Sequence, residues 1–165
     1  MCRNPIKLSQ SSGVPIDDFA KQYLFKPLGI NNLNWGHTSR KKVIPSGKRL
    51  YMTSRDLAKI GLLILNNGMW NNEQVVSEKW VRESTTAKTK ITGMEYAYFW
   101  WNIPFSINGE VINSITATGN GGQYIMVFPE FEMVAVFTGG AYNSQEDKLP
   151  FAIVNRVFLP TFVDR

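Results

Sequence analysis

The first apolar stripe of the chain predicts a helix that faces a core. Its residues, at positions 19, 20, 23 and 24, have the i, i+1, i+4, i+5 spacing of one helix face. Pro15 suits the first helical position, and Pro27 and Gly29 end the pattern. The segment 31–50 is rich in Asn, Gly, Ser and Lys, and it is predicted to be a long loop.

A second helix is predicted to begin just after Thr53. Thr53 and Asp56 stand three positions apart, which is the spacing of a capping box. Positions 57–65 are apolar on most sides, so we expect this helix to be deeply buried. Asn67 and Gly68 then supply a typical C-terminal stop.

A shorter helix is predicted over residues 78–84. Ser77 precedes it and has the side chain of a good N-cap. Trp80 and Val81 are its apolar residues, and we expect both to face inward.

The second half of the chain changes to short runs rich in β-branched and aromatic residues. These runs are 96–103, 112–117, 122–128 and 133–138. Only four residues join the last two runs, so they are predicted to be antiparallel neighbours. A final amphipathic helix is predicted over 150–159, where Phe151, Val154 and Phe158 share a stripe. Helices, then strands, then a closing helix indicate an α+β fold, with an antiparallel sheet packed by helices.

Length and composition exclude several kinds of protein. A chain of 165 residues suggests one domain, and 44% hydrophobic residues are enough for a real core. Cys2 is the single cysteine and His37 the single histidine, so an internal disulfide and a Cys/His zinc site are both excluded. We therefore expect no metal and no cofactor.

Charge and hydropathy favour neither a nucleic-acid partner nor a membrane span. The net charge of +5 is a mild excess, and the basic residues between Arg40 and Arg49 are interrupted by Pro45, Ser46 and Gly47, as in a solvated loop. The longest strictly apolar runs are only about five residues, too short for a span. The first residues also lack the apolar segment of a secretory signal.

Three apparent catalytic motifs are better explained by chance. Ser39 and Lys42 match S-x-x-K, but they lie in a basic loop, where the lysine would not lose its proton. No G-x-S-x-G accompanies His37, so this residue is interpreted as a surface-loop histidine. The glycine pattern from Gly119 fails G-x-G-x-x-G, because Tyr124 stands at its last position.

The Gly-rich junction over 117–123 is the remaining candidate for chemistry. It lies between two predicted strands, where glycines let a substrate approach the backbone and exposed amides can point at an oxyanion. Three glycines in seven residues are also what a tight turn requires. From the residues alone, both interpretations stay open.

A series of motifs in a fixed order resembles the C-terminal half of the serine β-lactamase-like family. That family includes class C β-lactamases, D-alanyl-D-alanine carboxypeptidases, esterases and 6-aminohexanoate-dimer hydrolases. The resemblance covers about Ser12 to Leu159, and the Gly-Gly-Gln ending is closest to the esterase and dimer-hydrolase branch. The matching segments are Ser12–Gly13, Phe19–Ala20, 24–30, 52–61, 65–70, 96–101, 118–123 and Pro129.

The resemblance implies acyl transfer, in which a serine attacks an ester, amide or β-lactam carbonyl and water releases the acyl group. By residue-to-residue match, the backbone amide of Asn120 is one oxyanion donor. Ala117, Thr118, Gly119 and Gln123 are implied to bind substrate. Ala117 stands where the family has the lysine of K-[ST]-G, which favours an ester or amide substrate without the carboxylate that this lysine attracts.

The family's nucleophilic S-x-x-K and its Y-x-N motif have no credible counterpart in the chain. We therefore expect a fragment of a longer protein, with residues 1–11 as a poorly matched, disordered start and 12–165 as a partial domain. Its helical part would cover about 12–90, and its sheet and final helix about 91–160. The isolated chain is expected to be inactive and to expose an apolar face through which it can self-associate. Family resemblance suggests a periplasmic or secreted bacterial protein.

Two other functions compete with a catalytic half of a serine hydrolase. A non-catalytic binding or scaffold domain could keep the fold without the chemistry, and Ala117 in place of the lysine favours it. A basic nucleic-acid-binding module has only its charge in support, and salt-sensitive retention on DNA would be needed to establish it. An upstream reading frame with S-x-x-K followed by Y-x-N would favour the enzyme.

Overall fold

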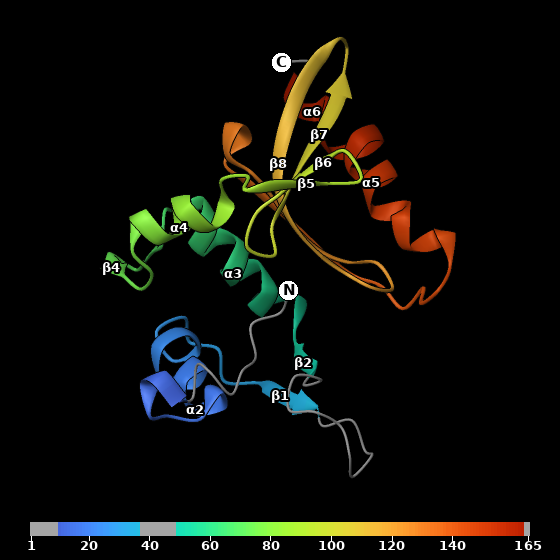
Figure 1. The fold of residues 1–165 in the computed structure, drawn as a ribbon. Coiled ribbons are helices and arrows are strands. Elements are labelled where there is room, and N and C mark those ends of the chain that lie inside the picture. Colours follow the sequence, from blue (N-terminus) through green and yellow to red (C-terminus); the bar gives the residue numbers. More distant parts are fainter. Residues whose placement is uncertain (1–9, 37–48, 164–165) are drawn as a thin grey trace. The chain divides into compact units, whose positions relative to one another are not determined.

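The computed structural model describes residues 10–36 and 49–163, which belong to two compact units (Figure 1). The first unit ends at Asp56 and the second begins at Leu57. Three features singled out in the sequence lie outside the described residues: the S-x-x-K match at Ser39–Lys42, His37, and the greater part of the poorly matched start, residues 1–9.

The first unit combines a short helical segment with a pair of strands. Helix α2 (Ile16–Ala20) follows Pro15 at its N-cap and continues as a π-helical turn, η1 (Lys21–Phe25). Strands β1 (Leu33–Gly36) and β2 (Arg49–Met52) are antiparallel, so the predicted loop over 31–50 is wrong at both of its ends. The aromatic ring of Trp35 packs 6.5 Å from the ring of Phe25, and this contact gives β1 an apolar anchor that composition did not reveal.

The capped helix predicted after Thr53 is confirmed as α3 (Ser54–Leu65). Thr53 Oγ1 accepts a hydrogen bond from the Asp56 amide at 3.2 Å and donates one to Asp56 Oδ2 at 2.8 Å. Gly68, the predicted stop, has a φ of +85°. The expected deep burial is only partial, because Leu63 is buried while most apolar residues of the helix are half-buried.

The shorter helix is confirmed as α4 (Glu78–Thr85), and the Ser77 hydroxyl accepts from the Trp80 amide. Val81 is buried, but Trp80 is 50% exposed, so its predicted inward orientation is wrong. Consecutive helical residues point about 100° apart, and only one of the two can face the core directly. A small hairpin of β3 (Met69–Trp70) and β4 (Glu73–Gln74) joins α3 to α4.

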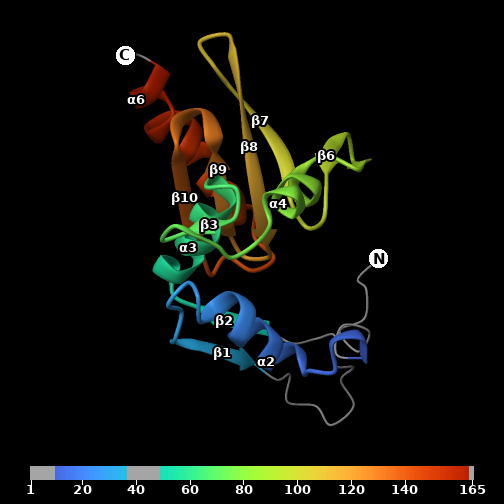
Figure 2. The same ribbon diagram turned by 90° about the vertical axis from the view of Figure 1, so that its left-hand side faces the viewer.

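A six-stranded antiparallel sheet dominates the second unit (Figure 2). Its order is β10-β9-β8-β7-β6-β5, and β9 and β10 form the predicted hairpin around the turn η3 (Pro129–Phe131). The run predicted over 96–103 is interrupted at residues 97–100, where the chain bends. The strands are β5 (Thr89–Ile91), β6 (Met94–Tyr96), β7 (Trp101–Ile107), β8 (Glu110–Gly119), β9 (Gln123–Phe128) and β10 (Met133–Thr138).

The C-terminal segment forms the predicted final helix in several pieces. The pieces are η4 (Gln145–Lys148), α5 (Leu149–Ile153), the π-helical turn η5 (Val154–Phe158) and α6 (Pro160–Val163). Val154, at the centre of the predicted stripe, is fully buried, and Phe151 is half-buried. Leu159, which the stripe did not include, is also fully buried. Phe158, at the end of that stripe, is 39% exposed and packs its ring 6.5 Å from Phe137.

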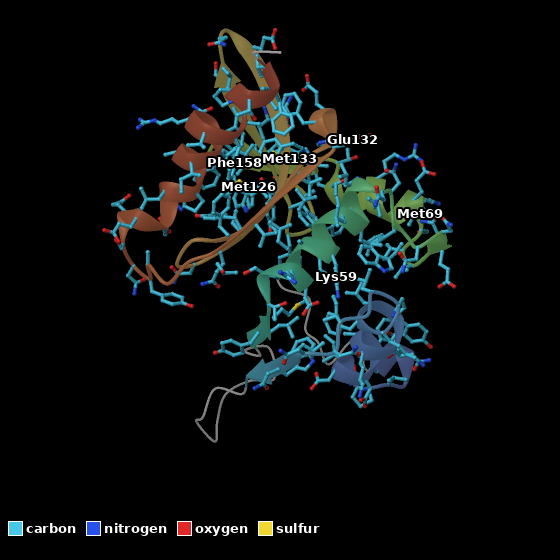
Figure 3. All side chains as sticks on the ribbon, turned by 180° about the vertical axis from the view of Figure 1, so that it is seen from behind. Lys59, Met69, Met126, Glu132, Met133 and Phe158 are labelled. Carbon is cyan, nitrogen blue, oxygen red and sulfur yellow. The ribbon has the colours of Figure 1, made fainter. Side chains whose placement is uncertain are left out.

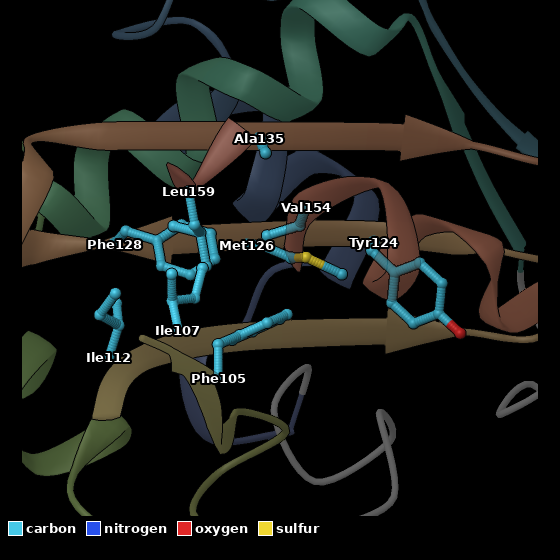
Figure 4. Packing of buried hydrophobic residues seen from close by; sticks show 9 residues of the cluster. All are labelled: Phe105, Ile107, Ile112, Tyr124, Met126, Phe128, Ala135, Val154 and Leu159. Carbon is cyan, nitrogen blue, oxygen red and sulfur yellow. The ribbon is translucent and has the colours of Figure 1, made fainter. Parts of the chain in front are cut away.

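The two faces of the sheet are covered by different helices. On one face, the α3 position Gly61 lies directly against Val134 of β10 and Ile125 of β9. On the other face, the final helix packs on a core to which Met126 and the partly buried Met133 contribute (Figure 3). This arrangement confirms the predicted α+β fold. The buried members of the core are Phe105, Ile107, Ile112, Tyr124, Met126, Phe128, Ala135, Val154 and Leu159 (Figure 4).

Candidate functional site

The residues singled out in the sequence lie where β8 passes into β9. Strand β8 ends at Gly119 and β9 begins at Gln123, so residues 120–122 form the turn between two hydrogen-bonded neighbours. Thr118, Gly119 and Asn120 are exposed, and we call these three residues the lip. Gly121 and Gly122 are buried, and we call them the glycine turn.

The register of the sheet separates the lip from Ala117. Thr118 is paired with Tyr124, whereas Ala117 is paired with Ile125. Directly paired residues share a face, and successive residues alternate between faces. Thr118 is therefore on the face covered by the final helix, and Ala117 is on the face covered by α3.

An open pocket of about 480 Å³ lies beside the lip. One side of the pocket is apolar and aromatic, and it comes from β6, β7, β9 and α5. These residues are Met94, Trp101, Ile103, Tyr124 and Phe151. The polar residues of the lining are the three lip residues, Asp147 and Lys148. A largely apolar pocket with a few polar groups is the common form of a small-molecule site.

Tyr124 connects the pocket to the core of the sheet. Its ring is 3% exposed and packs 4.8 Å from the ring of Phe151. The ring lies at one end of the apolar cluster, and its hydroxyl points away from Met126 (Figure 4). The apolar wall of the pocket is therefore continuous with the rigid packing of the core.

The glycine turn is held from behind by residues 139–142. The carbonyl of Gly122 accepts from the Gly139 amide at 3.0 Å, and the carbonyl of Gly121 accepts from the Ala141 amide at 3.1 Å. Gly121 has a φ of +91°, and a Cβ there would meet the ring of Tyr142 at 2.8 Å. The tight-turn interpretation therefore describes the glycine turn, while the lip stays open to the pocket.

Gln123 belongs to this packing and does not line the pocket. Its side-chain Nε2 donates to the carbonyl of Gly139 at 2.9 Å and to the Tyr142 hydroxyl at 3.1 Å. Of the five residues that the sequence singled out, the structure thus brings Thr118, Gly119 and Asn120 together at the pocket. Ala117 lies on the opposite face, and Gln123 lies behind the turn.

A charged pair stands at the pocket where the final helix begins. Lys148 Nζ lies 3.3 Å from Asp147 Oδ2, with side chains 63% and 18% exposed respectively. Partial burial lowers the pKa of Lys148, but the Tyr124 hydroxyl and the Asp147 carboxylate outweigh it, so the pKa lies above its usual value. Lys148 is therefore a cation at neutral pH.

Sequence reasoning missed both members of this pair. Asp147 and Lys148 follow Asn120 by more than 25 positions, and they match no motif. The acidic Glu146 and Asp147 resemble ordinary first-turn residues of a helix, which gives them a structural explanation. Only the packing of α5 on the sheet brings them beside the lip.

The described part of the chain holds no cluster of three or more His, Cys, Asp or Glu side chains placed to bind a metal ion. Within the same residues, no helix combines the length and the apolar character that crossing a membrane requires.

Comparison with known proteins finds likeness in structure. No model of a known protein family matches the sequence, and no curated protein matches it. A protein assigned as a 6-aminohexanoate-dimer hydrolase from Bacillus anthracis has a TM-score of 0.68 at 18% identity, over 88% of this chain and 38% of that one. A class C β-lactamase has a TM-score of 0.64 at 16% identity, over 92% of this chain and 53% of that one. A penicillin-binding protein from Bacillus halodurans has a TM-score of 0.62 at 12% identity, over 90% of this chain and 52% of that one.

The similar structures and the sequence motifs indicate the same fold. The chain spans about half of the length of the class C β-lactamase and the penicillin-binding protein, and less of the dimer-hydrolase relative. At these identities the likeness concerns the fold. The chain therefore has the fold of β-lactamases and penicillin-binding proteins, as its motifs predict, over about half of such a protein.

Proposed function

We propose that the chain is the C-terminal part of a serine hydrolase that cleaves an ester or amide through an acyl-enzyme. One observation carries the proposal: the lip that the motifs single out as the oxyanion segment borders an open, mostly apolar pocket. A lip folded against the protein's own packing would have no room for a substrate. The fold shared with β-lactamases supports the same class of chemistry.

In this proposal, the lip stabilises the transition state. A serine hydroxyl from outside these 165 residues attacks the carbonyl carbon and gives up its proton to a base. The backbone amide of Asn120 donates to the oxygen that becomes negative, and Thr118 offers its hydroxyl to the substrate. Collapse of the tetrahedral intermediate expels the alcohol or amine, and water then releases the acyl group.

The apolar wall gives the substrate its second point of contact. Trp101, Ile103 and Phe151 can hold an acyl or leaving group with an apolar body, and burial of that body stabilises binding. The lysine of the family's K-[ST]-G strand is replaced by Ala117, and by the resemblance this favours an ester or amide over a β-lactam; Ala117 itself lies on the sheet face opposite the pocket.

The first test concerns the chain alone. The purified 165 residues, treated with p-nitrophenyl butyrate, are expected to show neither a burst of p-nitrophenol nor an acyl adduct by mass spectrometry, since the S-x-x-K match at Ser39–Lys42 is interpreted as chance. An adduct on any serine would contradict the assignment of the nucleophile to another segment.

The second test concerns a longer chain. Where the coding DNA upstream contains S-x-x-K followed by Y-x-N, the longer protein is expected to form the adduct. Asn120→Pro removes the proposed donor and should lower the acylation rate about 100- to 1,000-fold, the usual cost of losing one oxyanion donor. Asn120→Ala keeps the amide and is the matched control. Equal rates for both variants would remove Asn120 from the mechanism.

A non-catalytic binding domain of the same fold is the second candidate. The absence of a lysine at Ala117 favours it. An upstream frame without a serine nucleophile, or a longer chain that binds small amides and never acylates, would favour the binding domain over the enzyme.

A further inference from the structure

We propose that Met94 determines which substrates the pocket accepts, by folding its side chain over an unbranched apolar chain bound against Trp101. The inference rests on the proposed function, because it names the substrate class of the same pocket: esters or amides of medium-length linear apolar chains. Met94 acts on the apolar part of the substrate and not on the reacting carbonyl, which the proposed function assigns to the lip.

Met94 belongs to the hairpin of β5 and β6 at the edge of the sheet (Figure 1). Strand β6 joins this hairpin to β7 through two paired positions, Glu95 with Asn102 and Tyr96 with Trp101. Met94 lies two residues before Tyr96, so it is on the same face of the sheet as Tyr96 and Trp101. This face carries the pocket, and Met94 is part of the pocket lining.

The turn of the hairpin determines where Met94 stands. Thr92 and Gly93 have φ angles of +50° and +85°, the two positive values of a type I′ turn, and Ile91 pairs directly with Met94 across it. Every residue from 89 to 95 is exposed, and a Cβ at Gly93 would meet no atom within 4 Å. The strand therefore holds Met94 at the pocket while its side chain stays accessible to a ligand.

The rest of the apolar wall is fixed by packing. The ring of Trp101 lies 4.5 Å from the ring of Tyr96, and the ring of Phe151 lies 4.8 Å from the buried ring of Tyr124. Met94 differs from these residues because it is 42% exposed. A ligand that covers Met94 therefore removes additional apolar surface from water, and this burial strengthens binding.

The chemistry of methionine suits a contact that adapts to the ligand. The side chain is unbranched, has three rotatable bonds and carries a polarizable thioether, so it fills irregular gaps. In a pocket of about 480 Å³, a chain that extends from the lip along Trp101 has room to reach Met94. Each methylene buried between the two side chains adds to the affinity, whereas a short acyl group held at the lip gains nothing from Met94.

The experiment compares two neutral ligands that differ in chain length alone. Butanamide and octanamide are titrated into the 165-residue chain, and binding is followed by NMR shifts of the Trp101 indole N–H and of the methyl group of Met94. Octanamide is expected to bind at least about tenfold more tightly, because each fully buried methylene is worth about a fourfold gain in affinity. Octanamide should shift the Met94 methyl resonance, and butanamide should not.

The variants assign the length preference to one residue. Met94→Ala should reduce it at least about threefold and leave butanamide binding unchanged. Met94→Leu conserves the apolar volume and should retain the preference, whereas Met94→Gln keeps the length without the apolar surface and should lose it. Val111→Ala is the matched control, because Val111 is an exposed apolar residue beside the similar turn at Asn108 and Gly109. It should leave the preference intact.

Each outcome decides the role of Met94. Equal binding of the two amides, a preference that survives in both Met94→Ala and Met94→Gln, or failure of both amides to bind would overturn it. A preference that depends on Met94, together with a longer chain that never acylates, would uphold the role of Met94 and overturn the hydrolase. A longer chain that p-nitrophenyl acetate and octanoate acylate, at relative rates that Met94→Ala does not change, would do the reverse.

Discussion

The lip and the glycine turn are adjacent in the chain, yet they are held in opposite ways. Thr118, Gly119 and Asn120 are exposed at the pocket, whereas Gly121 and Gly122 are buried against residues 139–142. Two backbone hydrogen bonds fix the turn from behind, and no comparable packing covers the lip among the described residues. In this short segment the lip is accessible to solvent, and the glycine turn next to it is fixed by packing.

This division explains what each glycine does. The positive φ of Gly121 and its close approach to Tyr142 are requirements of packing, and they would be needed in a protein without any activity. Gly119 has no positive φ and lines the pocket, and a Cβ there would meet the Cβ of Gln123 at 3.2 Å. Substitutions in the glycine turn should therefore affect stability more than substitutions in the lip.

The largest loss of stability is expected from a substitution where the glycine turn packs against residues 139–142. Gly139→Ala places a Cβ 2.5 Å from the Gly121 carbonyl oxygen, and backbone atoms must move to relieve this contact. We expect a loss of about 2–4 kcal/mol in the free energy of unfolding, measured with urea. Gly140→Ala has open space around its Cβ and should change stability by less than about 0.5 kcal/mol. Equal effects of the two variants would contradict the packed turn.

An intermediate loss of stability is expected when Gln123 is replaced. Gln123→Met keeps the length of the side chain and removes the donor to the Gly139 carbonyl. The expected loss is about 1 kcal/mol in the free energy of unfolding, the usual net value of one hydrogen bond. Gln145→Met, at an exposed position, is the control. A loss of ligand binding at unchanged stability would instead assign Gln123 to the pocket.

A smaller effect on stability is expected from the charge of Lys148, and this contribution should be lost only at high pH. The pKa of Lys148 is raised above 10.5, so its contribution to stability is complete below that pH and lost as the pH rises through the folded-state pKa. With 63% of the side chain exposed, we expect about a few tenths of a kcal/mol. The stability difference between wild type and Lys148→Met should be constant from pH 6 to 9 and shrink above pH 10.5. A change near neutral pH would contradict this.

The smallest effect on stability is expected at the lip itself. Thr118→Val and Asn120→Ala change exposed side chains and should alter the free energy of unfolding by less than about 0.5 kcal/mol. Thr118→Val should still weaken ligand binding, because it removes the hydroxyl from the pocket. A large loss of stability from either variant would show that the lip is structural.

Local patterns predicted the local structure of this chain well. The capping box at Thr53, the N-cap at Ser77 and the β9–β10 hairpin are confirmed, since each depends on neighbours within a few residues. The errors concern longer-range effects. Trp80 is exposed and packs on Tyr98, and β1 and β2 pair across a segment that looked like a loop.

The candidate site was predictable on the strand side only. The motif at 118–120 could be found because its residues are consecutive, and the register then separates Ala117 from Thr118 by face. Lys148 and Asp147 could not be found, because their place at the pocket depends on how the final helix packs on the sheet. Tyr124 looked like an ordinary strand residue, and its position at the end of the core brings its hydroxyl within hydrogen-bond reach of Lys148.

The lip borders a pocket that small molecules should be able to enter. In a Cys2→Ser background, Asn120→Cys is expected to react with a thiol reagent about as fast as Gly140→Cys, which is exposed elsewhere. Saturating 3-phenylpropanamide should slow labelling of Asn120→Cys at least about threefold, because a ligand in the pocket covers the lip. Labelling of Gly140→Cys should be unchanged. Slow labelling at position 120, or labelling that no ligand slows, would contradict the account.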